Sequence, residues 1–192
     1  MPDLVLASSS PFRRSLLAKL GLPFSCRTPD TDETPLPGES AQALVMRLAE
    51  HKALAARRAD VDELIIGSDQ VALLGETILG KPQDHANATA QLRLCRGQTV
   101  TFLTGLCLLN SGNGRTQVVI EPFEVHFRDL TDAQIERYLR TEQPYQCAGS
   151  FKSEGLGIAL FRRLQGNDPN ALVGLPLIRL IELLGNEGIT LP

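Results

Sequence analysis

The chain opens with a short apolar run that leads directly into a helix, and this feature limits the fold more than any other. Leu4–Ala7 has the continuous apolar character of a buried strand, and residues 8–10 are all serine. Ser10 occupies an N-cap position, and Pro11 suits the first helical turn. A helix N-terminus offers unpaired backbone N–H groups, so this βα junction can bind an anion.

An arginine lies on the apolar stripe of this predicted helix. Arg13 precedes Leu16, Leu17 and Leu20 by the helical spacings that place all four side chains on one face. Two interpretations are open: the guanidinium extends past the end of the stripe into water, or it points into a polar pocket at the sheet edge.

Length and composition fit one folded domain, or one domain with a lobe, and we expect a single domain over residues 1–192. Hydrophobic residues make up 43% and charged residues 21% of the 192 positions, which is enough to bury a substantial core. The formal charge of −3 gives no general attraction to nucleic acid or to an anionic membrane. Any phosphate site must therefore be a local cationic pocket.

The cysteines and the chain start predict a cytoplasmic protein. The four cysteines are scattered without a C-x-x-C pair, and the three histidines lack metal-ligand spacing. We therefore expect small, mostly buried thiols in a reducing compartment. The sequence has neither a signal-peptide pattern nor an apolar stretch long enough for a membrane span.

Two segments supply a further cation and a carboxylate. Residues 28–40 form a stiff acidic loop that contains Glu33, and Ser40 caps a predicted helix over 41–58. Lys52 lies four residues after Leu48, on the apolar face of that helix. Glu33 is either a solvated loop carboxylate or a ligand, and Lys52 either extends past the core or points into a site.

A second buried strand ends in a polar cluster. Residues 64–66 are apolar and Ser68-Asp69-Gln70 follows, so Asp69 lies where ligands bind in α/β sheets or else satisfies a turn. Residues 71–74 and 77–79 predict a hairpin that leads to Lys81. The pattern then predicts two long paired strands (98–110, 116–128), a helix (132–142), a strand (158–161) and a final helix (173–184).

Cations and carboxylates from separate segments suit one ligand class. Arg13, Lys52 and Lys81 can neutralise phosphate oxygens, while Asp69 and Glu33 can hold a hard metal and activate water. If they converge, the pattern indicates a site for a Mg²⁺-bound polyphosphate.

Several motifs, in this order along nearly the whole chain, resemble the Maf family of nucleoside-triphosphate pyrophosphatases. They are Ala7-Ser8-Ser9-Ser10-Pro11 with Arg13-Arg14, Asp32-Glu33, Lys52, Ser68-Asp69-Gln70, Gly80-Lys81-Pro82, Gly149-Ser150-Phe151 and the segment from Gly166 to Pro176. The resemblance implies a mixed α/β fold related to inosine-triphosphate pyrophosphatases: a twisted mixed sheet flanked by helices, with a long antiparallel ribbon. It also implies a cytoplasmic homodimer.

The resemblance further implies Mg²⁺- or Mn²⁺-dependent cleavage between the α- and β-phosphates of a nucleoside triphosphate. Asp69 matches the family's general base. Glu33 and Asp69 match the positions of the carboxylates on the side of the site that binds the metal ion. The positions that contact polyphosphate in the family are matched here by Ser8, Arg13, Lys52 and Lys81.

Within the family, the chain resembles the subgroup that hydrolyses N7-methyl-GTP. The stretches Gly67-Ser68-Asp69-Gln70 and Phe151–Gly155 carry this likeness, and the subgroup associates the positions of Phe12, Gln70 and Glu154 with base choice. The subgroup often has tryptophan where this chain has Phe12. A carboxylate can accept hydrogen bonds from guanine N1–H and the exocyclic amine, and an aromatic ring attracts the cationic base by about 0.5–2 kcal/mol.

Three other interpretations remain open. The chain could be a pyrophosphatase for dTTP, UTP or CTP, or a nucleotide-binding regulator of septum formation. It could also be a phosphate-binding module that uses only the first helix, which would leave Lys52, Lys81 and Glu154 without a role. Glu154 is then a solvated loop carboxylate beside Lys152.

Overall fold

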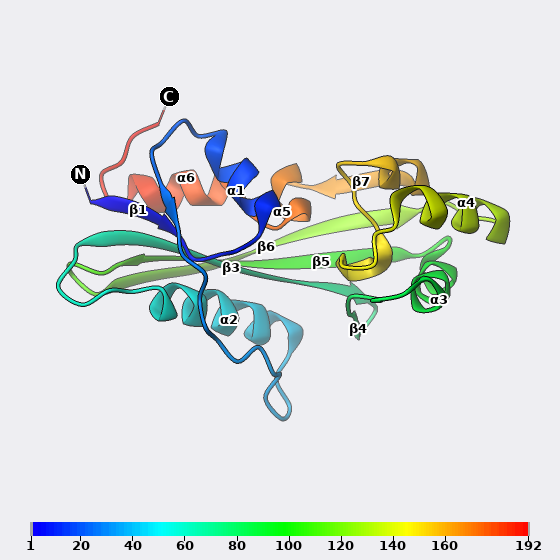
Figure 1. The fold of residues 1–192 in the computed structure, drawn as a ribbon, viewed down its shortest axis with the longest axis horizontal. Helices are drawn as coiled ribbons and strands as arrows, with labels where there is room; N and C mark the ends of the chain where they lie inside the picture. The colour runs from blue at the N-terminus through cyan, green and yellow to red at the C-terminus, as the bar shows by residue number, and fades with distance from the viewer. Residues whose placement is uncertain (1, 192) are drawn as a thin grey trace. The chain divides into compact units, whose positions relative to one another are not determined.

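The computed structural model describes residues 2–191 and contains a seven-stranded mixed sheet in the order β2-β1-β3-β5-β6-β7, with β4 paired to β3 (Figure 1). The strands are β1 (Asp3–Leu6), β2 (Ser25–Cys26), β3 (Glu63–Leu74), β4 (Thr77–Leu79), β5 (Thr99–Asn110), β6 (Arg115–Phe127) and β7 (Phe161–Gly166). The helices are α1 (Pro11–Ala18), α2 (Ala41–Ala55), α3 (His85–Cys95), α4 (Asp132–Glu142), α5 (Pro169–Val173) and α6 (Leu177–Gly185), with 3₁₀ turns η1 (Ala148–Ser150) and η2 (Leu156–Leu160). The mixed α/β fold with flanking helices is as predicted.

The chain divides into two compact units. The first contains residues 1–70, 103–121 and 168–192, and the second contains residues 71–102 and 122–167. Strands β3, β5 and β6 each contribute residues to both units. A single domain over 1–192 stays a prediction.

In the first unit, the sheet is covered by helices on both faces (Figure 1). Strand residues alternate between faces, so Leu4, Leu6, Leu64 and Ile66 pack with α1 and α6 in one core cluster. Val5 and Ile65 belong to the other cluster, together with alanines of α2. Strand β1 pairs in parallel with the first residues of β3, with Leu6 opposite Ile66, so the carboxyl end of β1 lies beside the middle of β3. Strand β3 continues through Ser68, Asp69 and Gln70 to Leu74, so Asp69 lies within the strand and not at its end as predicted.

Helix α2 packs unusually close to the sheet at two glycines. A Cβ on Gly67 of β3 would lie 2.0 Å from the carbonyl oxygen of Ala49, and one on Gly105 of β5 would lie 2.2 Å from that of Val45. Only glycine permits this approach. The sequence pattern did not show that either glycine is needed for this packing.

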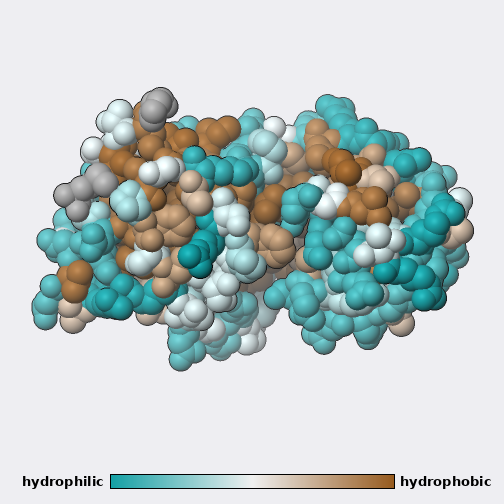
Figure 2. Space-filling model, turned by 45° about the horizontal axis from the view of Figure 1, so that its top comes forward, coloured by the Kyte–Doolittle hydropathy of each residue, from teal (hydrophilic) through white to brown (hydrophobic). Residues whose placement is uncertain are grey.

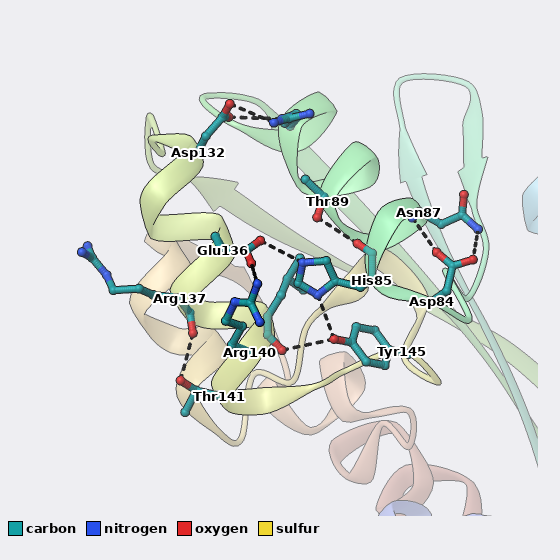
Figure 3. A network of polar contacts seen from close by, with 12 residues as sticks. Asp84, His85, Asn87, Thr89, Asp132, Glu136, Arg137, Arg140, Thr141 and Tyr145 are labelled. Carbon is teal, nitrogen blue, oxygen red and sulfur yellow. Dashed lines mark hydrogen bonds and ion pairs between the residues drawn. The ribbon is translucent and has the colours of Figure 1, made fainter.

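The second unit is built around an aromatic cluster and two polar helices. Phe151 makes edge contacts with Phe102, Phe127 and Phe161 at centroid distances of 5.4, 5.6 and 4.8 Å. Helices α3 and α4 are joined by polar contacts in which His85 lies between Glu136 and the Tyr145 hydroxyl (Figure 3). The packing of Phe151 against these three aromatic rings fixes one end of the loop that follows it.

Three predicted elements differ from the structure. Residues 156–160 form a 3₁₀ turn, and the strand predicted over 158–161 begins only at Phe161. The final helix predicted over 173–184 begins only at Leu177, as α6, because Gly174 has a φ of 109° and Pro176 has no backbone N–H to donate; residues 169–173 form the separate short helix α5. Helix α2 ends at Ala55 rather than at Arg58.

The long ribbon forms as predicted by β5 and β6, which are neighbours in the sheet. Pro122 lies just before the β6 residues that pair with β7, which begin at Phe123, so its missing N–H breaks no bond to β7. None of the helices within residues 2–191 is both long and apolar enough to cross a membrane.

Candidate active site

The βα junction at the start of the chain forms the predicted helix N-terminus. Ser10 caps α1, and its side-chain oxygen accepts a hydrogen bond from the Arg13 backbone N–H at 3.4 Å. The buried Ser8 hydroxyl accepts from the Ser10 N–H at 3.1 Å. Phe12 stands in the first helical turn with 40% of its surface exposed. The junction therefore places hydroxyls, helix N–H groups and an aromatic ring together.

Arg13 points into the protein and not past the end of its stripe. Its Nε donates to the Gly174 carbonyl oxygen at 2.8 Å, and the Ser68 hydroxyl donates to the same oxygen at 2.8 Å. Gly174 lies between α5 and α6, and buried Asp168 accepts from the N–H groups of Asn170 and Ile178 on these two helices. Residues 168–176 thus hold Arg13 beside Ser68 of β3.

Lys52 is a buried cation held between two carboxylates. Its Nζ lies 2.7 Å from Asp69 Oδ1 and 2.6 Å from Glu33 Oε1, and only 7% of the residue is exposed. Lys52 comes from α2, Asp69 from β3 and Glu33 from the loop before α2. The Glu33 side chain is 61% exposed, whereas Asp69 is buried, so removing Lys52 would leave a buried carboxylate without this cation.

Arg13 belongs to the same electrostatic environment. Burial lowers the pKa of the Arg13 guanidinium from its ordinary value, while the charges of Asp69 and Glu33 oppose that shift. Two cations and two carboxylates therefore share one region beside the middle of β3, next to the carboxyl end of β1. Of the predicted site residues, this unit unites Ser8, Phe12, Arg13, Glu33, Lys52, Asp69 and Gln70.

The carboxylate pair fits a hard divalent cation. Glu33 and Asp69 both direct an oxygen at one positive centre, the Lys52 ammonium, and carboxylate oxygens are ligands that Mg²⁺ and Mn²⁺ accept. Within residues 2–191 no group of three or more His, Cys, Asp or Glu side chains could hold one metal ion. Water and phosphate oxygens would complete the shell, as is usual for Mg²⁺.

Gln70 is attached to the scaffold through its amide nitrogen. Nε2 donates to Thr104 Oγ1 at 2.9 Å and to the Ala171 carbonyl oxygen at 2.7 Å. Since both amide hydrogens have acceptors within the protein, a nucleobase could meet Gln70 only through its Oε1 acceptor.

The hydrogen bonds of Arg47 to Glu39 and Thr34 form a clasp that attaches the acidic loop to α2, and the sequence did not predict it. Arg47 donates from Nε and Nη2 to Glu39 at 2.6 and 2.7 Å, and from Nη2 to the Thr34 carbonyl oxygen at 3.1 Å. Thr34 follows Glu33, and Arg47 precedes Lys52 on the same helix. The clasp therefore fixes the loop relative to the helix. The spacing of Glu39 and Arg47 alone gives no signal for it.

The clasp predicts acid-sensitive stability. The Arg47 guanidinium, the Leu36 N–H and nearby positive charge lower the pKa of Glu39 from 4.5 to about 2. A depressed carboxyl pKa gives stability that is full above the unfolded-state value and lost as the pH falls toward 2. We expect Glu39→Gln to lower the unfolding free energy at pH 6 and to converge with the parent near pH 2. Denaturant melts across this range test it, and a pH-independent difference would contradict it.

Lys81 and Glu154 belong to the second unit, so their approach to the first cluster stays a prediction. Lys81 follows β4 and is exposed. Glu154 is exposed in the loop after Phe151, and the Ser153 hydroxyl donates to it at 3.3 Å. Lys81 and Glu154 both act electrostatically on the half-buried Cys147 thiol, whose pKa is raised mainly by burial. Both side chains therefore lie in one neighbourhood of the second unit.

A βα anion site beside two carboxylates and a buried lysine is what a nucleotide-phosphate hydrolase needs, and sequence comparison agrees. Residues 3–187 match the family described as Maf-like protein, and the chain belongs to the Maf family. This confirms the resemblance inferred from the motifs.

Relatives that share one name align with nearly the whole chain. A protein of Nitrosococcus oceani is 63% identical over 187 residues, covering 97% of this chain and 94% of the relative. One of Alcanivorax borkumensis is 61% identical over 191 residues, with coverages of 100% and 97%. One of Pseudomonas syringae pv. syringae is 57% identical and covers both chains fully. Each is named 7-methyl-GTP pyrophosphatase.

Proposed function

We propose that this chain is a nucleoside-triphosphate pyrophosphatase that hydrolyses N7-methyl-GTP to N7-methyl-GMP and pyrophosphate. The observation that carries the chemistry is the convergence of Glu33 and Asp69 on Lys52 beside the α1 N-terminus. The substrate follows from full-length relatives at 57–63% identity that bear that activity as their name. Removal of modified nucleotides is the role that we assign to it.

In the proposed reaction, Asp69 takes a proton from the attacking water. The water oxygen bonds to the α-phosphorus, the bond from that phosphorus to the bridging oxygen breaks, and pyrophosphate leaves with the bridging oxygen. The Asp69 carboxylate is held in place by the Lys52 ammonium at 2.7 Å. Its position within a buried strand keeps it fixed while the proton moves.

The phosphate groups are bound by cations and hydroxyls. Ser8 and the N-terminus of α1 contact phosphate oxygens, and Arg13, Lys52 and Lys81 neutralise the charge that develops on pyrophosphate. Glu33 and Asp69 would hold Mg²⁺ or Mn²⁺, which when bound polarises phosphate oxygens and lowers the pKa of bound water.

We assign recognition of the base to Phe12, Gln70 and Glu154, which the family resemblance associates with base choice. Phe12 is exposed in the first turn of α1 and can stack on a cationic purine, with the attraction that such contacts provide. Gln70 offers Oε1, and Glu154 offers a carboxylate to the guanine N1–H and amine. Thymine lacks that pair of donors.

The activity is tested by pyrophosphate release from N7-methyl-GTP, GTP, dTTP, UTP and CTP, each with Mg²⁺ and again with excess EDTA. We expect N7-methyl-GTP to give the highest kcat/KM and EDTA to abolish release. A preference for pyrimidines would keep the enzyme class but overturn the base assignment. No release from any nucleotide would favour the nucleotide-binding regulator of septum formation.

We also propose that the enzyme is a cytoplasmic homodimer. The support for both statements is the family resemblance, to which the free cysteines add agreement with a reducing compartment. Hydrophobic surface gathers over α6 in Figure 2, where Ile178 and Ile181 are exposed, and a dimer contact would cover such surface. Light scattering should give about twice the chain mass of 20.9 kDa.

A further inference from the structure

We infer that Glu142 is a positioning residue for Glu154 and thereby sets base selectivity. Glu142 is the last residue of α4, and its side chain reaches the loop that follows Phe151. The inference rests on the proposed function, because it concerns how the carboxylate of Glu154 is presented to the guanine base. No motif in the sequence singles out Glu142.

Glu142 holds the chain on both sides of Glu154. Its Oε2 accepts a hydrogen bond from the backbone N–H of Leu156 at 2.8 Å, two residues after Glu154. Its Oε1 lies 3.3 Å from the ammonium of Lys152, two residues before Glu154. One carboxylate therefore fixes both flanks of Glu154, and the Glu142 side chain is only 18% exposed.

The rest of the loop is tightened by the same helix and by close backbone packing. The Lys152 N–H donates to the Tyr138 hydroxyl at 3.1 Å, and Tyr138 lies one turn before Glu142 on α4. A Cβ on Gly155 would lie 2.7 Å from Glu142 Oε2, and one on Gly157 would lie 2.2 Å from the Lys152 carbonyl oxygen. The backbone contact at Gly157 requires glycine there, and a side chain at position 155 would displace the Glu142 carboxylate.

This arrangement suits recognition of a base by a carboxylate. An exposed glutamate on an unconstrained loop would lose side-chain and backbone entropy on binding, which reduces affinity. A loop fixed on both sides of Glu154 loses less of that entropy on binding. Removing Glu142 should therefore affect only substrates that Glu154 contacts.

The test compares Glu142→Ala, Glu154→Ala and the double variant on N7-methyl-GTP and dTTP. For Glu142→Ala we expect kcat/KM for N7-methyl-GTP to fall roughly tenfold through KM, with dTTP changed by less than about twofold. In the double variant, the Glu142 substitution should add no further loss of selectivity to that of Glu154→Ala. Equal losses on both substrates, or additive losses of selectivity, would overturn the inference.

A matched control lies on the same helix. Glu136 pairs with Arg140 at 2.6 Å and with His85 at 2.8 Å, as Figure 3 shows, and Glu136→Ala should leave selectivity unchanged. If Glu142→Ala fails to fold, Glu142→Gln keeps an acceptor for Leu156 but loses the charge facing Lys152, and a smaller selectivity loss is expected. Unchanged selectivity in Glu142→Gln would then overturn the inference. A parent enzyme without preference for N7-methyl-GTP would instead refute the proposed function.

Discussion

Replacing Asp69 with asparagine is expected to lower kcat by about 10³-fold, within the range that a general base contributes. The side-chain amide keeps an oxygen that can accept from Lys52, whose ammonium lies 2.7 Å from the native carboxylate. It cannot take a proton from water at neutral pH, so the chemistry fails while the fold persists. The measurement is pyrophosphate release with N7-methyl-GTP, alongside thermal melting and circular dichroism.

The control for this substitution is Asp129→Asn, since Asp129 is an exposed carboxylate outside the proposed site. It should retain parental kcat. If Asp69→Asn keeps more than about a tenth of the parental rate, Asp69 is not the base, because a general base contributes at least about 10²-fold. The phosphate-contact assignments of Arg13 and Lys52 would survive that outcome.

Replacing Gly67 with alanine is expected to give the largest loss of stability. The new Cβ would lie 2.0 Å from the Ala49 carbonyl oxygen and 2.8 Å from the Ala53 nitrogen, both in the backbone of α2. Because a backbone cannot rotate away, the helix must move from the sheet. Overpacking costs about 1–3 kcal/mol or more, which for a chain of this size lowers the melting temperature by about 2–4 °C per kcal/mol.

The same displacement should reduce activity, since α2 carries Lys52 and β3 carries Asp69. We expect Gly67→Ala to lose activity even well below its melting temperature. Gly185→Ala is the matched control, because a Cβ at Gly185 meets nothing within 4 Å. Parental stability and activity in Gly67→Ala would show that α2 does not need its close approach.

The sequence by itself determined the type of secondary structure wherever that structure depends on residues only a few positions apart. Ser10 and Ser40 cap helices as predicted, because an N-cap depends only on a side chain and the backbone a few residues on. The apolar run before Ser8 predicted β1 for a similar reason. The motifs were also sufficient to identify the Maf family, which the match over residues 3–187 confirms.

Local patterns failed where backbone conformation depended on distant packing. The predicted strand over 158–161 is mostly a 3₁₀ turn, and Gly157 lies against the Lys152 carbonyl in a path that periodicity cannot reveal. The final helix predicted over 173–184 begins only at Leu177, because Gly174 takes a left-handed conformation and presents its carbonyl to Arg13 and Ser68. Apolar spacing carries no information about such a contact.

Only the tertiary structure decided which charges meet. Sequence spacing predicted that Lys52 lies on an apolar face and Asp69 at a strand end. For each of the two residues, it left open whether the role is structural or belongs to a binding site. The approach of α2 to β3 at Gly67 brings Lys52 to Asp69, and the hydrogen bonds of Arg47 hold the loop that carries Glu33 on the same helix. Burying an ammonium is unfavourable unless carboxylates surround it, and that compensation comes from residues distant in sequence. The chemistry of this protein therefore depends on contacts that form only after the chain has folded.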